Sequence, residues 1–282
     1  MLSDKARRRL ARALTYVVIA GAIIAASIPL YWLVSTAFKP GWAITHRPPL
    51  LVPPHVSLEH FSKSLFGTVQ FEGALGSIKD SLIVALGNTT LCLVVGLFAS
   101  YSIVRFRTGG QNFSFWILSN RFLPPVTFIV PLFIILKSVR LFDTHLSLIL
   151  IYCTFNIPFA TWLLMGFIQE IPEDLEEAAM IDGCSRISAF LKVIVPLVTP
   201  GVAVTALFSF LFSWNEYIMA LLLTGRKINT LPVSIPKYRG AHDILYGEIS
   251  AVAIVAIIPA VILALMLQKY LVKGLTVGAV KG

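Results

Sequence analysis

Long apolar runs alternate with shorter polar segments along most of this 282-residue sequence. A helix of about 20 residues crosses a hydrocarbon core about 30 Å thick. An isolated segment in lipid must satisfy its own backbone hydrogen bonds, so each long apolar run is predicted to be a helix. The pattern predicts six spans: Leu14–Phe38, Leu82–Val104, Phe115–Lys137, Leu146–Ile168, Leu197–Leu223 and Ile249–Leu271.

Prolines recur inside these predicted spans. A proline inside a soluble helix costs about 3 kcal/mol. In a membrane bundle, neighbouring helices and water can satisfy the carbonyl groups that a proline frees, so kinks that line a pathway are expected. The residues concerned are Pro29, Pro124, Pro125, Pro131, Pro158, Pro200 and Pro259.

Composition supports the membrane assignment. The sequence is 57% hydrophobic and 13% charged, whereas soluble chains carry about 25% charged residues. We therefore predict an all-α integral membrane protein. Its organisation is an N-terminal segment (residues 1–13), one membrane domain (14–271) and a C-terminal tail (272–282). The net charge of +9 does not indicate nucleic-acid binding, because no basic stripe is interleaved with aromatic residues.

The basic N-terminus sets the predicted orientation. A positive cluster before the first span favours the anionic cytoplasmic lipid face, and the first helix usually decides topology. Six spans then place both termini in the cytoplasm. The first apolar run is too long for a signal-peptide core of about 7–15 residues, so an uncleaved helix is expected. The cluster consists of Lys5, Arg7, Arg8, Arg9 and Arg12.

A polar segment between the fourth and fifth predicted spans, Ile171–Gly201, reads as a helix–turn–helix. Pro172 suits a first helical turn, and acidic residues follow it at the positive end of the helix dipole. Asp182-Gly183 predicts a break, and Ser185 predicts the cap of a second helix that ends before Pro196. From composition alone, this helix–turn–helix either transmits the movement of a soluble partner into the membrane bundle or rests on the membrane surface.

Within this segment, Glu177-Ala178-Ala179, then Gly183, then Val193-Ile194-Val195-Pro196 resembles the EAA signature of bacterial ABC import permeases. The resemblance implies the six-helix transmembrane domain of a type I ABC importer. It also implies that about 172–195 forms cytoplasmic coupling helices that dock on an ATP-binding subunit. The residues it assigns to coupling are Glu176, Glu177, Ala178, Ala179, Asp182 and Gly183.

Three further stretches resemble the carbohydrate-importer branch, in particular the second permease of maltose-type systems: 121–125 (RFLPP), 214–217 (WNEY) and the tail 274–282. The family implies a heterodimer with a second permease, two ATP-binding subunits that bind ATP and Mg, and an extracytoplasmic solute-binding protein. It implies a bacterial inner-membrane location and no cofactor in this chain. Residues 275–282 of the tail are expected to reach toward the ATPase, with a frayed terminus as the alternative.

Several polar residues in the predicted spans are candidates for contact with a solute. Arg121 and Glu216 should face the bundle interior or water, because a charge in lipid is costly. An internal ion pair, or snorkelling of Arg121 to an interface, is the alternative. Planar polar groups and aromatic faces suit sugars, although an aromatic side chain at a span end also anchors at the interface. The other candidates are Asn88, Asn120, Asn156, Trp214, Asn215 and Tyr217.

Motifs for catalysis are missing from the sequence. It has no G-x-x-x-x-G-K-[ST] phosphate loop, no H-E-x-x-H and no G-x-S-x-G, so ATP hydrolysis is expected in a partner. Cys92, Cys153 and Cys184 have no metal-ligand spacing, and no disulfide is expected. An ion-coupled secondary transporter is the alternative function, which predicts coupling-ion ligands and two similar halves. The external segments 46–55 and 225–247 are either partner contacts or connectors.

Overall fold

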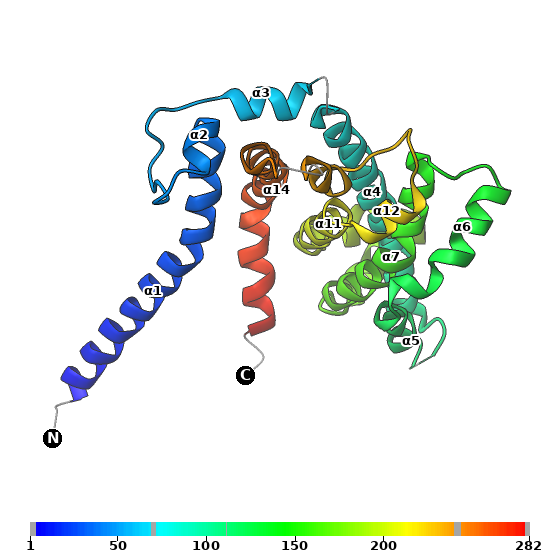
Figure 1. The fold of residues 1–282 in the computed structure, drawn as a ribbon. Coiled ribbons are helices and arrows are strands. Elements are labelled where there is room, and N and C mark those ends of the chain that lie inside the picture. Colours follow the sequence, from blue (N-terminus) through cyan, green and yellow to red (C-terminus); the bar gives the residue numbers. More distant parts are fainter. Residues whose placement is uncertain (1–3, 69–71, 111, 240–243, 280–282) are drawn as a thin grey trace. The chain divides into compact units, whose positions relative to one another are not determined.

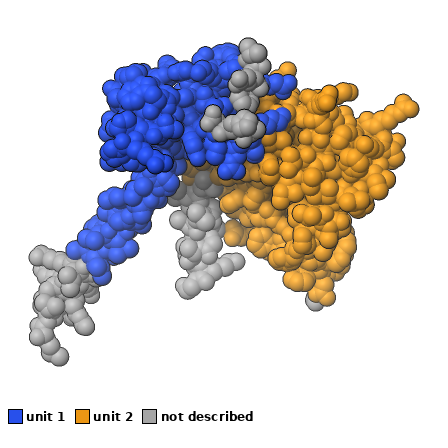
Figure 2. Space-filling model, viewed as in Figure 1, with its two compact units in different colours: residues 1–74, 235–256 blue, residues 75–234, 257–282 orange. Residues whose placement is uncertain are grey.

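The computed structural model describes residues 4–68, 72–110, 112–239 and 244–279, and the side chains among them from residue 12 to residue 270. These residues form two compact units, which Figure 2 shows in separate colours. Unit 1 holds residues 1–74 and 235–256, and unit 2 holds residues 75–234 and 257–282. The predicted tail lies partly beyond the described residues, but the last helix continues along the backbone to Ala279.

Unit 1 is built on the first long helix and the start of the last one. Its elements are α1 (Asp4–Phe38), α2 (Gly41–Ile44), α3 (Glu59–Phe66), η4 (Ile235–Tyr238) and the first part of α14 (Tyr246–Ala279). The short helix α3 packs on α1 through the rings of Phe61 and Phe38, whose centroids lie 5.0 Å apart. It meets α14 where His60 Nδ1 lies 3.2 Å from Glu248 Oε1.

Unit 2 contains most of the spans and the whole predicted coupling segment (Figure 1). Its elements are α4 (Ala74–Phe106), α5 (Phe113–Ser119), η1 (Asn120–Phe122), η2 (Pro125–Phe128), α6 (Ile129–Ser138), α7 (His145–Gln169), α8 (Asp174–Ile181), α9 (Arg186–Ala189), the π-helical turn η3 (Phe190–Ile194), α10 (Val195–Leu197), α11 (Thr199–Trp214), α12 (Ile218–Leu223) and α13 (Leu231–Ser234).

The predicted all-helical membrane architecture is confirmed. Four helices of the described chain are long and apolar enough to cross a membrane: 12–38, 74–106, 145–169 and 246–270. Two bent helix pairs raise the number to as many as six, if each pair is one span. These four unbroken helices correspond to the first, second, fourth and sixth predicted spans. The third and fifth predictions, each a single continuous helix, were wrong.

The third predicted span breaks at Leu123 and Pro124. The helical segments Phe113–Phe122 and Pro125–Ser138 meet at 88°. Leu123 and Pro124 have extended backbones, with ψ of 127° and 125°. A residue before proline disfavours the helical region, and proline itself has no N–H to donate. Two successive prolines therefore stop the helix within an apolar sequence.

The fifth predicted span ends early, at Trp214. Asn215 and Tyr217 lie between α11 and the short helix α12, so 199–223 is not one helix. The bent pair at this place instead joins 186–197 to 199–214 at 75°. The polar sequence Asn215-Glu216 interrupts the apolar run here, because its side chains bond to local backbone groups and compete with helix continuation.

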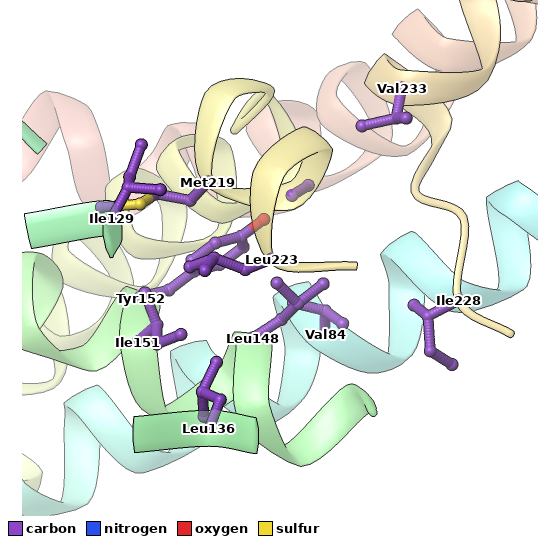
Figure 3. Close-up of a cluster of buried hydrophobic side chains, with 11 residues drawn as sticks. Val84, Ile129, Leu136, Leu148, Ile151, Tyr152, Met219, Leu223, Ile228 and Val233 are labelled. Carbon is purple, nitrogen blue, oxygen red and sulfur yellow. The ribbon is translucent and has the colours of Figure 1, made fainter. Parts of the chain in front are cut away.

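Helix α7 packs closely with α4 and α11. A Cβ added to Gly96 of α4 would lie 3.2 Å from the Cβ of Ala160, so a glycine allows the two backbones to approach. Figure 3 shows the main apolar cluster, in which α7 contributes Leu148, Ile151 and Tyr152 beside Met219 and Leu223 of α12. Close packing rather than hydrophobic burial holds such helices together in lipid.

A buried polar network ties the same three helices together. Asn88 of α4 accepts hydrogen bonds at Oδ1 from Asn156 Nδ2 (2.8 Å) and Ser213 Oγ (2.7 Å). Its Nδ2 donates to the carbonyl oxygen of Ile149. Cys92 and Cys153 lie beside it as free thiols, with their sulfur atoms 3.9 Å apart. Asn88 therefore joins helices within the bundle. The sequence alone could not distinguish this structural role from contact with a solute.

Asp143 anchors the connection between α12 and α13. Its carboxylate accepts hydrogen bonds from four successive backbone N–H groups, those of residues 225–228, at 2.9–3.1 Å. Burial raises the pKa of Asp143, but these four donors outweigh it and hold the pKa below its ordinary value. The carboxylate therefore stabilises the fold at neutral pH.

Replacing Asp143 with asparagine should loosen this connection. Asp143→Asn turns one acceptor oxygen into a donor that faces N–H groups, and we expect a loss of about 1–3 kcal/mol in stability. Hydrogen exchange at residues 225–228 and thermal unfolding in detergent measure the effect. Because the pKa is lowered, the wild-type stabilisation should persist above about pH 4 and disappear below it. Asp182→Asn, at an exposed aspartate, is the control, and equal effects of the two variants would contradict the assignment.

Candidate functional site

The helix–turn–helix after α7 forms largely as predicted. Helix α8 begins at Asp174 with three acidic residues in its first turn, which suits the positive end of the helix dipole. Pro172 was wrongly placed in that turn, because it lies before the cap residue Glu173. Ser185 caps α9 by accepting a hydrogen bond from the backbone N–H of Ser188 at 3.3 Å, as predicted.

The second helix does not end before Pro196. It continues through the π-helical turn η3 into α10, which contains Pro196. Proline cannot donate a backbone hydrogen bond, and its ring clashes with the carbonyl group four residues earlier in an α-helix. A wider helical turn just before Pro196 relieves that conflict, so the chain stays helical until the 75° bend into α11.

Gly183 forms the turn between α8 and α9. Its φ is +92°, a conformation that side chains disfavour. The N–H of Gly183 donates to the carbonyl oxygen of Met180, and that of Cys184 to Ala179. These two bonds form a Schellman cap, which usually requires glycine at this position. A Cβ on Gly183 would meet nothing within 4 Å, so backbone conformation rather than space demands glycine here.

Glu176 anchors this segment to α4. Its carboxylate accepts a hydrogen bond from the Tyr101 hydroxyl, and Arg105 Nε donates to it at 3.1 Å. The side chains of Arg105 and Glu176 are only 7% and 6% exposed. Arg105 also donates to the carbonyl oxygen of Ile171 at 2.9 Å. We call Tyr101, Arg105 and Glu176 the Glu176 clamp; it joins the start of α8 to the end of α4.

The other predicted coupling residues lie outward from the clamp. Glu177, Ala178, Asp182 and Gly183 are exposed, and Ala179 is half-buried. Large apolar side chains are exposed beside them: Ile181 is 87% exposed and Ile187 is 67% exposed. The segment therefore has a buried side fixed to α4 and an uncovered side with acidic and apolar groups. No motif in the sequence predicts that Tyr101 and Arg105 take part in the clamp.

Three of the predicted solute-contact residues meet in one cavity of unit 2. This cavity, of about 210 Å³, has polar walls from Arg121, Tyr152, Asn156 and Glu216. Its apolar walls are Pro125, Phe155, Phe212 and Met219. We call it the Arg121 cavity. The expectation that both charged residues avoid lipid is consistent with this placement, since Arg121 and Glu216 are half-buried.

The remaining predicted residues lie outside the walls of the Arg121 cavity. Asn120 lines a separate apolar cavity of about 300 Å³ with Phe128 and Thr154. Trp214 is buried and stacked on Phe210, and Asn215 is exposed and donates to the carbonyl oxygen of Leu211. Tyr217 is exposed at the start of α12. Tyr152 and Phe155 were missed, because aromatic residues in an apolar helix look like core.

The internal ion pair that was the alternative for Arg121 and Glu216 is wrong for the described part of the chain, where other contacts hold both side chains. Among the described residues, no carboxylate forms an ion pair with Arg121. Its guanidinium lies over the rings of Phe212 and Phe159, 4.1 and 4.8 Å from their centres, and donates to the carbonyl oxygen of Phe155 at 3.3 Å. Glu216 Oε1 accepts a hydrogen bond from the backbone N–H of Met219 at 3.0 Å, which caps α12.

The apolar spans, the bent helix pairs and the outer helix–turn–helix define a membrane permease of the ABC importer fold. The solved structure of a bacterial ABC transporter that imports the acidic polysaccharide alginate contains a chain similar to this one, with a TM-score of 0.77 and 21% identity. That match covers 96% of this chain and 99% of the other.

Residues 92–277 match the family described as binding-protein-dependent transport system inner membrane component, and the chain belongs to this family. It is similar to the trehalose transport system permease protein SugB of Mycobacterium tuberculosis, 37% identical over 261 residues, which are 91% of this chain and 93% of that protein. It also resembles the trehalose/maltose transport system permease protein MalG of Thermococcus litoralis, 33% identical over 271 residues, with 94% and 96% covered.

These matches confirm the predicted resemblance to carbohydrate-type ABC import permeases. The chain is a multi-pass inner-membrane permease component of a binding-protein-dependent ABC transporter. It is not itself the enzyme of that transporter, because ATP hydrolysis belongs to separate ATPase subunits.

Removing the carboxylate of Glu176 should destabilise the chain. Glu176→Ala leaves the buried guanidinium of Arg105 without its nearer carboxylate partner, and removing one partner of a buried pair costs about 3–5 kcal/mol. We expect the low end of this range, because Arg105 keeps its bond to Ile171. Thermal unfolding of the purified protein in detergent measures the loss. Glu177→Ala removes the adjacent exposed carboxylate and is the control; the clamp assignment fails if both variants melt alike.

Proposed function

We propose that this chain forms half of the translocation pathway of an ATP-driven importer for a sugar or sugar-like solute, such as an oligosaccharide, a polyol or a sugar derivative. SugB belongs to a trehalose transport system and MalG to a trehalose/maltose transport system, and both support the solute class. ATP binding in the partner closes the ATPase pair, and that motion switches the pathway between inward-facing and outward-facing states.

The segment 172–195 is proposed to couple this chain to the ATPase. The proposal rests on the difference between the two sides of the segment that holds α8 and α9: one is buried against α4 and the other is exposed. Glu176 is buried and clamped to α4, whereas Ile181 and Ile187 are exposed on the same segment. Apolar groups that a partner desolvates contribute most of the energy of an interface core. A force applied to the exposed side of the segment would be transmitted to α4 through the Glu176 clamp.

Further partners are proposed from the family and from the exposed surface. The most apolar stretch of α1 has none of its residues buried within the chain. We assign lipid and a second permease, in a heterodimer, as its surroundings. Two ATP-binding subunits face the coupling segment, and an extracytoplasmic solute-binding protein meets the opposite side. This arrangement places both termini in the cytoplasm, following the basic N-terminal cluster.

A pull-down of the tagged chain in mild detergent tests the assembly directly. We expect to recover a second permease and an ATPase, with ATP hydrolysis stimulated by a sugar-loaded binding protein. If the chain instead elutes alone and transports in liposomes on an ion gradient without ATP, the ion-coupled carrier replaces this proposal.

Gly183→Val should uncouple transport from ATP hydrolysis. Valine disfavours the positive φ of this turn, so the cap of α8 should open and α9 should lose its orientation toward the ATPase. We expect sugar uptake to fall by at least about tenfold, while membrane insertion is unchanged. Uptake and ATPase activity of the whole complex in proteoliposomes provide the measurement.

Gly110→Val is the matched control for this substitution. Gly110 also has a positive φ, +77°, and open space around its Cβ position, but it lies in the α4–α5 connection. The same backbone strain is thus introduced outside the coupling segment. Normal ATP-coupled uptake in Gly183→Val, or equal losses in both variants, would count against the coupling assignment.

A further inference from the structure

The Arg121 cavity lies where two helices break. One wall, Pro125, follows the interruption at Leu123 and Pro124, and another, Glu216, lies in the interruption between α11 and α12. At membrane depth, non-helical backbone is tolerated only where it is buried in protein or lines a water-filled cavity. Two interruptions that meet at one cavity provide polar backbone and side chains within an otherwise apolar bundle.

The cavity contains unused hydrogen-bonding groups of both kinds. The Tyr152 hydroxyl has no hydrogen-bond partner among the described residues, although Tyr152 is only 3% exposed. Figure 3 shows its oxygen directed toward the yellow helical segment that carries Met219 and Leu223. A buried polar group without a hydrogen-bond partner destabilises the fold. Such a group in the wall of a cavity points to a ligand that completes its hydrogen bonding.

The charged groups of the cavity add donors and acceptors. A guanidinium has five N–H groups, and Arg121 uses one of them on the carbonyl oxygen of Phe155. Glu216 uses one carboxylate oxygen to cap α12. Asn156 spends its amide nitrogen on Asn88 and Ser213, which leaves its carbonyl oxygen as an acceptor. The rings of Phe155 and Phe212 lie beside these groups.

The donors, acceptors and aromatic rings of the cavity indicate which kind of ligand can bind there. Sugar hydroxyl groups both donate and accept, so they can pair with Glu216 on one side and with Arg121 and Tyr152 on the other. The C–H face of a sugar ring suits the phenylalanine rings. Arg121 and Glu216 bring one positive and one negative charge to this cavity, so an uncharged ring leaves the two charges balanced. An acidic sugar would add a second negative charge beside the Glu216 carboxylate, which Arg121 alone would have to offset.

We infer that the Arg121 cavity is a transport subsite for one uncharged sugar ring, with Arg121 and Tyr152 donating to its hydroxyl oxygens and Glu216 accepting from its hydroxyl groups. This inference rests on the proposed function as a sugar importer and deepens it, because it assigns solute selection to this subunit, with a preference for uncharged rings over uronic and sulfonated sugars. Tyr152 contributes through its hydroxyl group alone.

The experiment uses the complete transporter in proteoliposomes with its solute-binding protein. The probes are a panel of neutral disaccharides beginning with trehalose and maltose, and an alginate disaccharide as the acidic probe. Tyr152→Phe removes only a hydroxyl group that has no partner within the described chain, so folding should be unaffected. We expect the KM for uptake of the neutral sugar to rise about fivefold, the value of one hydrogen bond.

Two further variants give the test its specificity. Tyr246→Phe removes the hydroxyl of an exposed tyrosine that is not among the residues lining the cavity, and it should leave KM unchanged. Glu216→Gln keeps an oxygen for the cap of α12 but removes the negative charge. We expect it to raise the ratio of acidic to neutral uptake at least about tenfold, a change that loss of structure alone would not produce.

Each remaining outcome overturns a defined part of the inference. Normal neutral-sugar uptake in Tyr152→Phe and an unchanged uptake ratio in Glu216→Gln would mean that the cavity is only structural. Uptake of the acidic probe in preference to neutral sugars by the wild type would refute the assigned sugar class while leaving the importer intact. Failure of every sugar to be taken up or to stimulate ATP hydrolysis would reject the sugar importer itself, and the subsite with it.

Discussion

Lipid offers no water to backbone N–H and C=O groups, and this constraint organises the whole chain. Apolar runs become helices because each helix satisfies its own backbone. The same constraint makes every interruption costly unless other groups compensate for it. Of the interruptions in unit 2, those at Leu123-Pro124 and Asn215-Glu216 border one cavity, and the bend after Leu197 follows the helix–turn–helix. The apolar helices therefore span the membrane, whereas the breaks between helical segments border the proposed sites.

Polar contacts between helices make the bundle of unit 2 specific. Apolar packing alone gives little preference for one helix pairing in lipid, whereas a buried polar group requires a particular partner. Asn88 joins α4, α7 and α11 in this way, and the Glu176 clamp joins α4 to α8. Helix α4 thus touches both the centre of the bundle and the segment proposed to meet the ATPase. A movement of α8 would reach the bundle without passing through a flexible loop.

The coupling segment was the best-predicted part of the chain because its signals are local. Acidic residues, Gly183 and Ser185 act on the backbone within a few positions of themselves, and the structure shows the cap bonds that these residues predict. The two errors, at Pro172 and Pro196, also concern local geometry. Proline tolerates several positions near a helix end, and a wider helical turn accommodated Pro196 where an ordinary α-helix would have stopped.

Hydrophobic length and capping residues act along the chain, so the helical membrane class, four unbroken spans and the helix–turn–helix of residues 172–195 could be predicted from the sequence. The sequence also contained the residues of the proposed subsite, but not their grouping. Only the tertiary structure placed Arg121, Asn156 and Glu216 around one cavity, left Asn120, Trp214, Asn215 and Tyr217 outside its walls, and added Tyr152. It also brought Tyr101 and Arg105 to Glu176, more than 70 positions away. Such meetings depend on the bends and packing of separate helices, which no short stretch of sequence encodes.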